Sequence, residues 1–236
     1  IGRAMAVNGS YASSNANLAK GIRLAEKFQD DELLVGSLVF HGIGQEIVGQ
    51  IGAGRQDIVR GLTLSESMGR PERYASDLVI LGMGYTVCHQ IESALDYLTE
   101  SLQRAEAINA VQTIGIASGG LGVNYTLLGD YTRAMSYLDR SADIAQQHGA
   151  MIHYVWFQAA RGEIERRTGD TFAARQRAES ALRKAAELRQ TLGEAETHLL
   201  LARLDMMDER FDSAQAHIQQ AIDSHTQNAI AALAAN

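Results

Sequence analysis

The sequence predicts an all-α fold, an α-solenoid built from about six helix-turn-helix repeats. Three observations support this class. The chain repeats itself with a constant period and without insertion or deletion, its apolar residues recur at helical spacing, and its glycines gather where the helical pattern stops. Neither helix of such a pair buries its apolar stripe alone, so the pairs must stack to form a continuous core.

The repeat is clearest at the predicted turns. The turn column, followed in both directions from Gly129 in equal steps, reads Gly9, Gly49, His89, Gly129, Gly169 and Glu209, which gives a period of forty. A glycine that follows a helix commonly adopts positive φ and closes its C-terminus. We therefore expect the units to turn near residues 9, 49, 89, 129, 169 and 209, within a single superhelical domain over 1–236.

Each unit divides into two helices of about 17 residues, or about 25 Å at 1.5 Å per residue. In the first helix of a unit, Leu121, Tyr125 and Leu128 follow helical spacing. Pro71 opens another first helix, where its missing N–H costs nothing. After the turn, Ala134 and Leu138 begin the apolar stripe of the second helix.

Two further columns of small residues lie inside the predicted helices. One runs through Gly122 and reads Gly2, Gly42, Gly82, Gly122, Gly162 and Ala202. The other runs through Ser141. Glycine weakens a helix by about 1 kcal/mol, so its recurrence there indicates that two helix backbones approach closely.

Composition narrows the function. The chain holds 21 Lys and Arg against 28 Asp and Glu, a net charge of −7, without the basic stripe that direct nucleic-acid binding requires. The single cysteine, Cys88, excludes an intramolecular disulfide. No apolar run approaches the ~18 residues of a membrane span. The sequence begins at Ile1, and we expect a cytoplasmic fragment of a longer protein with no membrane contact.

Catalytic and cofactor motifs are lacking. Gly42-Ile43-Gly44 and Gly82-Met83-Gly84 do not continue to a third glycine and do not follow a strand, as a dinucleotide fingerprint requires. No glycine run leads to the Lys-Ser or Lys-Thr of a phosphate-binding loop, and no histidines pair at metal-ligand spacing. We therefore predict a non-enzyme without catalytic residues, cofactor or metal.

The repeat resembles the tetratricopeptide repeat. The residues that carry the resemblance are Gly122, Tyr125, the turn Gly129-Asp130-Tyr131, Ala134, Leu138 and Ser141. The unit differs from the ~34-residue form in its length and in lacking the proline after the second helix. Longer units of this kind resemble those of bacterial regulators, including LuxR-type transcription activators and signalling ATPases. The resemblance implies a right-handed superhelix.

The resemblance also implies that the first helix of each unit lines a concave face, which defines a candidate binding groove. Its residues are Phe40, Ile43, Ile47, Ile80, Met83, Val87, Ile116, Val123, Leu127, Trp156, Arg166 and Arg167. The central three units supply apolar residues and the last two add charge. The positions that grip acidic chaperone tails in other tetratricopeptide domains are apolar or glycine here, so that clamp is excluded.

The groove has two interpretations. It binds a protein, a peptide, a partner helix or a second copy of the chain, or else its side chains turn toward neighbouring helices and are covered. Gly119-Gly120 at its centre opens space for a ligand or relaxes helix packing. The predicted function is a regulatory protein-interaction module of a larger bacterial signalling or transcription-regulating protein. The alternative is a sensor in which a small apolar effector controls oligomerisation.

Overall fold

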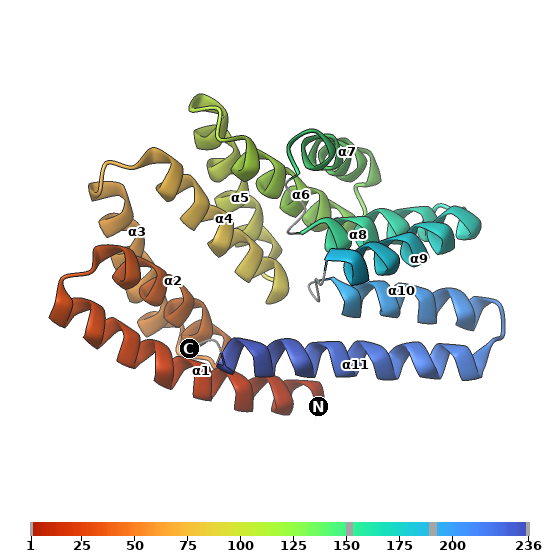
Figure 1. The fold of residues 1–236 in the computed structure, drawn as a ribbon, viewed down its shortest axis with the longest axis horizontal. Coiled ribbons are helices and arrows are strands. Elements are labelled where there is room, and N and C mark those ends of the chain that lie inside the picture. Colours follow the sequence, from red (N-terminus) through yellow and green to blue (C-terminus); the bar gives the residue numbers. More distant parts are fainter. Residues whose placement is uncertain (1, 150–152, 189–192, 235–236) are drawn as a thin grey trace. The chain divides into compact units, whose positions relative to one another are not determined.

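The protein is described by a computed structural model over residues 2–149, 153–188 and 193–234, in which all regular secondary structure is α-helical (Figure 1). This confirms the predicted class, an α-solenoid. The helices are α1 (Gly2–Phe28), α2 (Asp31–Ile47), α3 (Ile51–Ser67), α4 (Pro71–Val87), α5 (Ile91–Ala107), α6 (Val111–Leu128), α7 (Tyr131–His148), α8 (Tyr154–Arg167), α9 (Thr171–Leu188), α10 (Glu194–Met207) and α11 (Phe211–Ala234).

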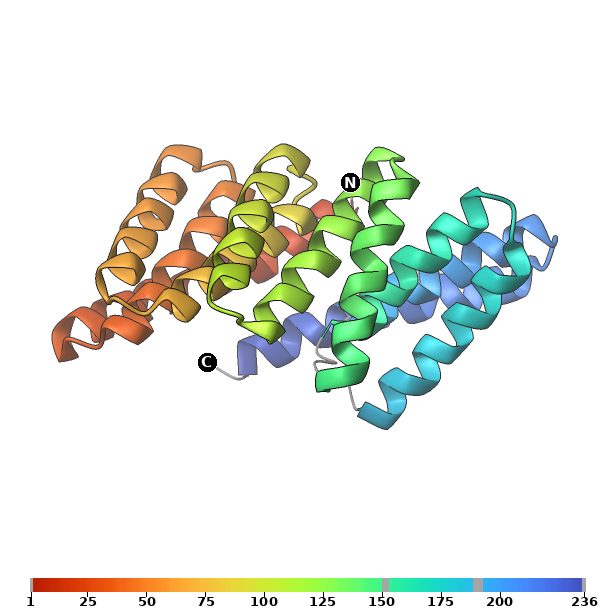
Figure 2. The same cartoon turned by 90° about the horizontal axis from the view of Figure 1, so that it is seen from above.

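The chain forms two compact units, and each is described by itself. Unit 1 extends to Ala117 and unit 2 runs from Ser118 to Ala234, with the boundary inside α6. In both units consecutive helices pair into hairpins, such as α2 with α3 and α8 with α9 (Figure 2). First helices also contact the next first helix, as α2 contacts α4 and α8 contacts α10. One continuous superhelical domain over 1–236 stays a prediction.

The turn between first and second helices has the same construction in each described hairpin. Its residue of positive φ is Gly49, His89, Gly129, Gly169 or Glu209. The backbone N–H of the residue after the turn donates to a carbonyl five residues earlier, at 3.0 Å from Asp130 to Tyr125 and 2.8 Å from Arg210 to Asp205. This bond closes the helix C-terminus. Asp130 also accepts the N–H of Arg133 at 3.0 Å and starts α7.

The expected turn near residue 9 is wrong, because α1 continues as a single helix from Gly2 to Phe28. Glycine permits positive φ but does not impose it, and His89 and Glu209 adopt that conformation without being glycine. A reversal forms where the helices on both sides pack against each other, as α2 and α3 do around Gly49.

Glycines inside the helices lie where two helices approach closely. A Cβ atom on Gly82 would lie 2.5 Å from Cγ of Leu98, and one on Gly122 would lie 2.5 Å from Cγ of Leu138. Both leucines are fully buried on the second helix of the same hairpin. The packing interpretation of this column is therefore confirmed, and it explains why a helix-weakening residue recurs there.

Side chains at one recurring pair of positions join the two helices of a hairpin. Tyr85 stacks on Tyr97 with ring centroids 5.5 Å apart, and one repeat later Tyr125 stacks on Tyr137 at 5.7 Å. In the next repeat an ion pair replaces the rings, since Nε of Arg177 donates to Glu165 at 2.8 Å. The backbone positions are shared, and the chemistry of the connection changes along the chain.

Candidate functional site

The ten groove residues other than Arg166 and Arg167 divide into three groups by burial. Phe40, Val87 and Leu127 are 50%, 55% and 47% exposed. Ile47, Ile80, Ile116 and Trp156 are half-buried. Ile43, Met83 and Val123 are only 8%, 7% and 6% exposed. The expectation that these last three line an open groove is therefore corrected, because a partner has no access to buried side chains.

Close packing of the first helices is what covers this column in unit 1. A Cβ atom on Gly84 of α4 would lie 2.7 Å from Cδ1 of Ile43, so α4 sits directly against this side chain. Ile43 belongs to a buried cluster with Val35 and Val39, and the half-buried Ile47 and Ile80 pack on the same cluster. In this part of unit 1, neighbouring helices cover the side chains of the predicted groove.

The glycine pair at the centre of the predicted groove does not leave a ligand space at Gly119. The ring of Phe157 fills the room that a side chain at Gly119 would occupy, since a Cβ atom would lie 2.1 Å from Cε2 of that ring. Gly119 therefore serves helix packing. The hollow beside Phe157, lined also by Leu138 and Ala145, has a volume of about 10 Å³, enough for one water and too small for an effector.

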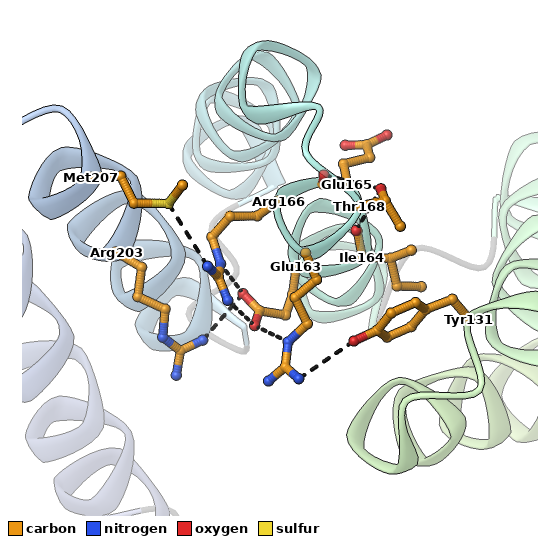
Figure 3. Close-up of polar contacts among 9 residues, drawn as sticks. Tyr131, Glu163, Ile164, Glu165, Arg166, Thr168, Arg203 and Met207 are labelled. Carbon is orange, nitrogen blue, oxygen red and sulfur yellow. Dashed lines mark hydrogen bonds and ion pairs between the residues drawn. The ribbon is translucent and has the colours of Figure 1, made fainter.

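Polar side chains of α8 and α10 meet around Glu163 (Figure 3). Arg166 donates to both oxygens of this carboxylate, from Nη2 at 2.8 Å and from Nε at 2.9 Å. Nε of Arg167 donates at 2.6 Å, and Nη1 of Arg203 donates at 3.3 Å. We call Glu163, Arg166, Arg167 and Arg203 the Glu163 cluster.

Two neighbours complete the surroundings of the Glu163 cluster. Nη1 of Arg167 lies 3.5 Å from the hydroxyl of Tyr131, at the start of α7. Nη1 of Arg166 lies 3.8 Å from the sulfur of Met207 on α10. The cluster therefore rests on three helices of unit 2 rather than on α8 alone.

The arginines control the charge of Glu163. Burial by itself would raise the pKa of its carboxyl, but the hydrogen bonds from Arg166 and Arg167 and the charge of Arg203 outweigh burial and lower that pKa to about 2. The carboxylate is ionised at neutral pH, and its hydrogen bond in turn raises the pKa of Arg166. Three positive charges thus surround one negative charge, in a chain whose net charge is −7.

Arg166 and Arg167, both in the predicted groove, share Glu163 as their partner. The sequence analysis did not join Arg203, Met207 or Tyr131 to them. The available signal was the repeat itself, because Arg203 stands one repeat after Glu163 and Met207 stands one repeat after Arg167. Trp156, another residue of the predicted groove, stacks on Phe157 with ring centroids 6.3 Å apart. Its backbone is also covered by Gly193, where a Cβ atom would lie 2.3 Å from N of Trp156.

The structure accounts for two other side chains capable of chemistry, Cys88 and His41. Burial raises the pKa of the Cys88 thiol to about 11, which keeps it protonated and unreactive at neutral pH. Nδ1 of His41 lies 2.7 Å from the Asp57 carboxylate. Within the described ranges, no three His, Cys, Asp or Glu side chains converge as metal ligands would. In the same ranges none of the helices combines the length and the apolar character that crossing a bilayer requires.

Comparison with known proteins identifies the fold. No protein-family model matches the chain, and no curated protein matches its sequence. The crystal structure of BtubC (BKLC) from P. vanneervenii is similar, with a TM-score of 0.64 and 16% identity over 94% of this chain and 91% of that one. Aspartyl phosphate phosphatase F from Bacillus subtilis has a TM-score of 0.65 and 14% identity over 94% of this chain. This chain spans 58% of that phosphatase. At these identities the similarity shows a helical-repeat fold alone.

Proposed function

We propose that this chain is a non-catalytic protein-interaction module of the tetratricopeptide type, a regulatory part of a larger cytoplasmic bacterial signalling or transcription-regulating protein. Its partner, a peptide or a segment of another protein, binds the first-helix face of unit 2. Binding uses side chains held on rigid helices and involves no bond making or breaking.

The Glu163 cluster is the observation that carries this proposal. It lies on α8 and α10, two first helices in contact, and it includes two guanidiniums that are about half exposed. Leu127 and Met207 occupy the same repeat position as Arg167 and are also about half exposed. Arginine guanidinium groups beside exposed apolar side chains are typical of protein-recognition surfaces.

Peptide selection tests the proposal. A random peptide library displayed on phage is panned against the purified chain, and selected peptides are measured by isothermal titration calorimetry. We expect saturable 1:1 binding that weakens at least about tenfold in Leu127→Asp and Met207→Asp, because a charge replaces an apolar contact. Leu188→Asp, at the end of α9, is the matched control and should bind as the parent chain does.

Two results of this experiment would contradict the proposal. If no peptide binds, or if binding is unchanged in both first-helix variants, this site does not serve partner recognition. A thermal-shift screen with small apolar metabolites separates the alternative function, since an effector that binds the folded state raises the melting temperature.

A further inference from the structure

The Glu163 cluster specifies the chemistry of its partner. Building on the proposed function, we infer that unit 2 binds an extended acidic segment whose carboxylate is held between Arg167 and Arg203. The same segment places one apolar side chain on Leu127 and another on Met207, about three residues to either side of its acidic residue.

The first step concerns the hydrogen-bond donors of the three arginines. Each guanidinium offers five N–H groups. All three nitrogens of Arg166 are engaged, two on Glu163 and one on the sulfur of Met207, and its side chain is only 20% exposed. Arg167 and Arg203 are 46% and 54% exposed. Within the described ranges, Nη2 of Arg167 and both Nε and Nη2 of Arg203 carry no hydrogen bond. These are the donors that a ligand would meet.

The second step is the charge balance. Another ion network of unit 2, the Asp205 network, joins Asp205 and Asp208 to Arg175 and Arg210, two negative charges to two positive ones. The Glu163 cluster has one negative charge and three positive charges, a surplus of two. A carboxylate that joins Arg167 and Arg203 reduces this surplus and forms charge-assisted hydrogen bonds with both forks. Acidic character in the partner therefore follows from complementarity.

The third step is the spacing of the contacts. Leu127, Arg167 and Met207 lie one repeat apart in sequence, at the same repeat position of the consecutive first helices α6, α8 and α10. Packed helices have axes about 8–10 Å apart. An extended chain advances about 3.3 Å per residue, so it passes one helix every three residues or so. The matching segment is apolar, two residues of any kind, acidic, two of any kind, apolar.

A fluorescein-labelled peptide of this pattern tests the inference by fluorescence anisotropy. The probe has Leu-Ser-Ser-Glu-Ser-Ser-Leu as its centre, between serine flanks, and is titrated with the full chain. We expect saturation below about 1 mM and a loss of about tenfold in affinity for each of Arg167→Ala and Arg203→Ala. Replacing the glutamate of the probe by glutamine should cost a similar factor, and salt should weaken the binding.

The matched control is Arg210→Ala, an arginine of similar exposure that belongs to the balanced Asp205 network. It should leave the affinity unchanged. Circular dichroism and thermal melting establish that each variant is folded. Glu163→Gln is the second test, because removal of the competing carboxylate should tighten binding of the acidic probe, whereas a purely structural cluster predicts no gain.

Three results would overturn the inference. The probe does not saturate by about 1 mM, or it binds equally to the parent chain and to the Arg167→Ala, Arg203→Ala double variant. The third result is that the chain binds a different probe more tightly, one whose leucines lie seven residues from the glutamate. That is the spacing expected of a helical partner. In each case the proposed function still stands if selected peptides depend on Leu127 and Met207, and it fails as well if they do not.

Discussion

Met83 in unit 1 and Glu163 in unit 2 occupy the same repeat position, two repeats apart. The first is buried among packed helices, and the second is an ionised carboxylate held by three arginines. The backbone is equivalent at both places, since each residue lies on a first helix at the same distance before a positive-φ residue, His89 or Gly169. The comparison teaches that one scaffold position becomes apolar core or the centre of an ion cluster according to its side chain.

The connections between paired helices differ in the same direction. In unit 1, α4 and α5 are joined by the stacked rings of Tyr85 and Tyr97. In unit 2, α8 and α9 are joined at the same position by the ion pair of Glu165 and Arg177. Unit 2 also contains the aromatic version, since Tyr125 of α6 stacks on Tyr137 of α7. The contrast between the ion pair of α8 and α9 and the aromatic stacks of the two preceding hairpins can be tested.

The largest effect is expected where the two units agree. Gly82→Val in unit 1 and Gly122→Val in unit 2 should each lower the free energy of unfolding by about 3 kcal/mol, because the new side chain meets Leu98 or Leu138. Chemical denaturation measures both. Gly52→Ala, where nothing lies within 4 Å, should instead stabilise by about 1 kcal/mol. If valine at either position left the free energy of unfolding unchanged, the two repeats would not be equivalent at this position.

The interhelical connections should differ in their response to salt. Arg177→Met should destabilise by about 2 kcal/mol at low ionic strength, since Glu165 keeps a charge without its partner. This loss should be smaller at high ionic strength, where the attraction between the two charges is screened. Tyr97→Leu should cost about 1 kcal/mol, with little change over the same range of salt. Equal salt dependence of the two variants, measured by chemical denaturation, would contradict the contrast.

Acid and alkali should affect the two units differently. Hydrogen bonds and nearby arginines lower the pKa of Glu163 to about 2 despite its burial, so the stability from this group is lost as the pH falls from about 4.5 toward 2. Burial lowers the pKa of His153 to about 4. The free energy of unfolding therefore falls as the pH drops from 6.5 to 4, where the unfolded chain takes up a proton at this imidazole and the folded chain does not. In unit 1, burial is the main cause that raises the pKa of Tyr85, and its hydrogen bond to Glu46 adds to the effect. The free energy of unfolding therefore falls above pH 10, where the phenol ionises in the unfolded chain.

Trp156, the single tryptophan, reports on unit 2. Its fluorescence should change on acidification before most of the helical circular dichroism is lost. His153→Phe should remove the part of this change between pH 6.5 and 4. Simultaneous fluorescence and dichroism transitions in acid, unaffected by that substitution, would show that the units do not differ in this respect.

The smallest effect is expected at the turns. His89→Gly in unit 1 and Glu209→Gly in unit 2 should each stabilise by about 0.5 kcal/mol, because glycine relieves the strain of positive φ at an entropic cost. Thermal melting measures the shift. Gly129→Ala is the reverse substitution and should destabilise by about 1 kcal/mol. Destabilisation by both glycine substitutions would show that the native side chains make contacts that outweigh the strain.

Much of the fold was predictable because helix pairs repeat locally. The spacing around Leu121 and Leu138, Pro71 at a helix start and glycines at turns are all signals within a few residues of the element that they define. The turn expected at Gly9 failed because glycine permits a reversal and packing imposes it. Burial of Ile43 and the filling of Gly119 by Phe157 depend on how neighbouring helices approach, and no local signal contains that distance.

The sequence by itself determined the helical class and the length of the repeat, since these follow from periodicity and residue type. Only the tertiary structure decided which side chains of the first helices remain accessible. It covered Ile43, Met83 and Val123, and it brought Arg203 to Glu163 across two helices. The physical reason is that exposure and ion pairing depend on distances of a few ångströms between helices, which residue spacing along the chain does not specify.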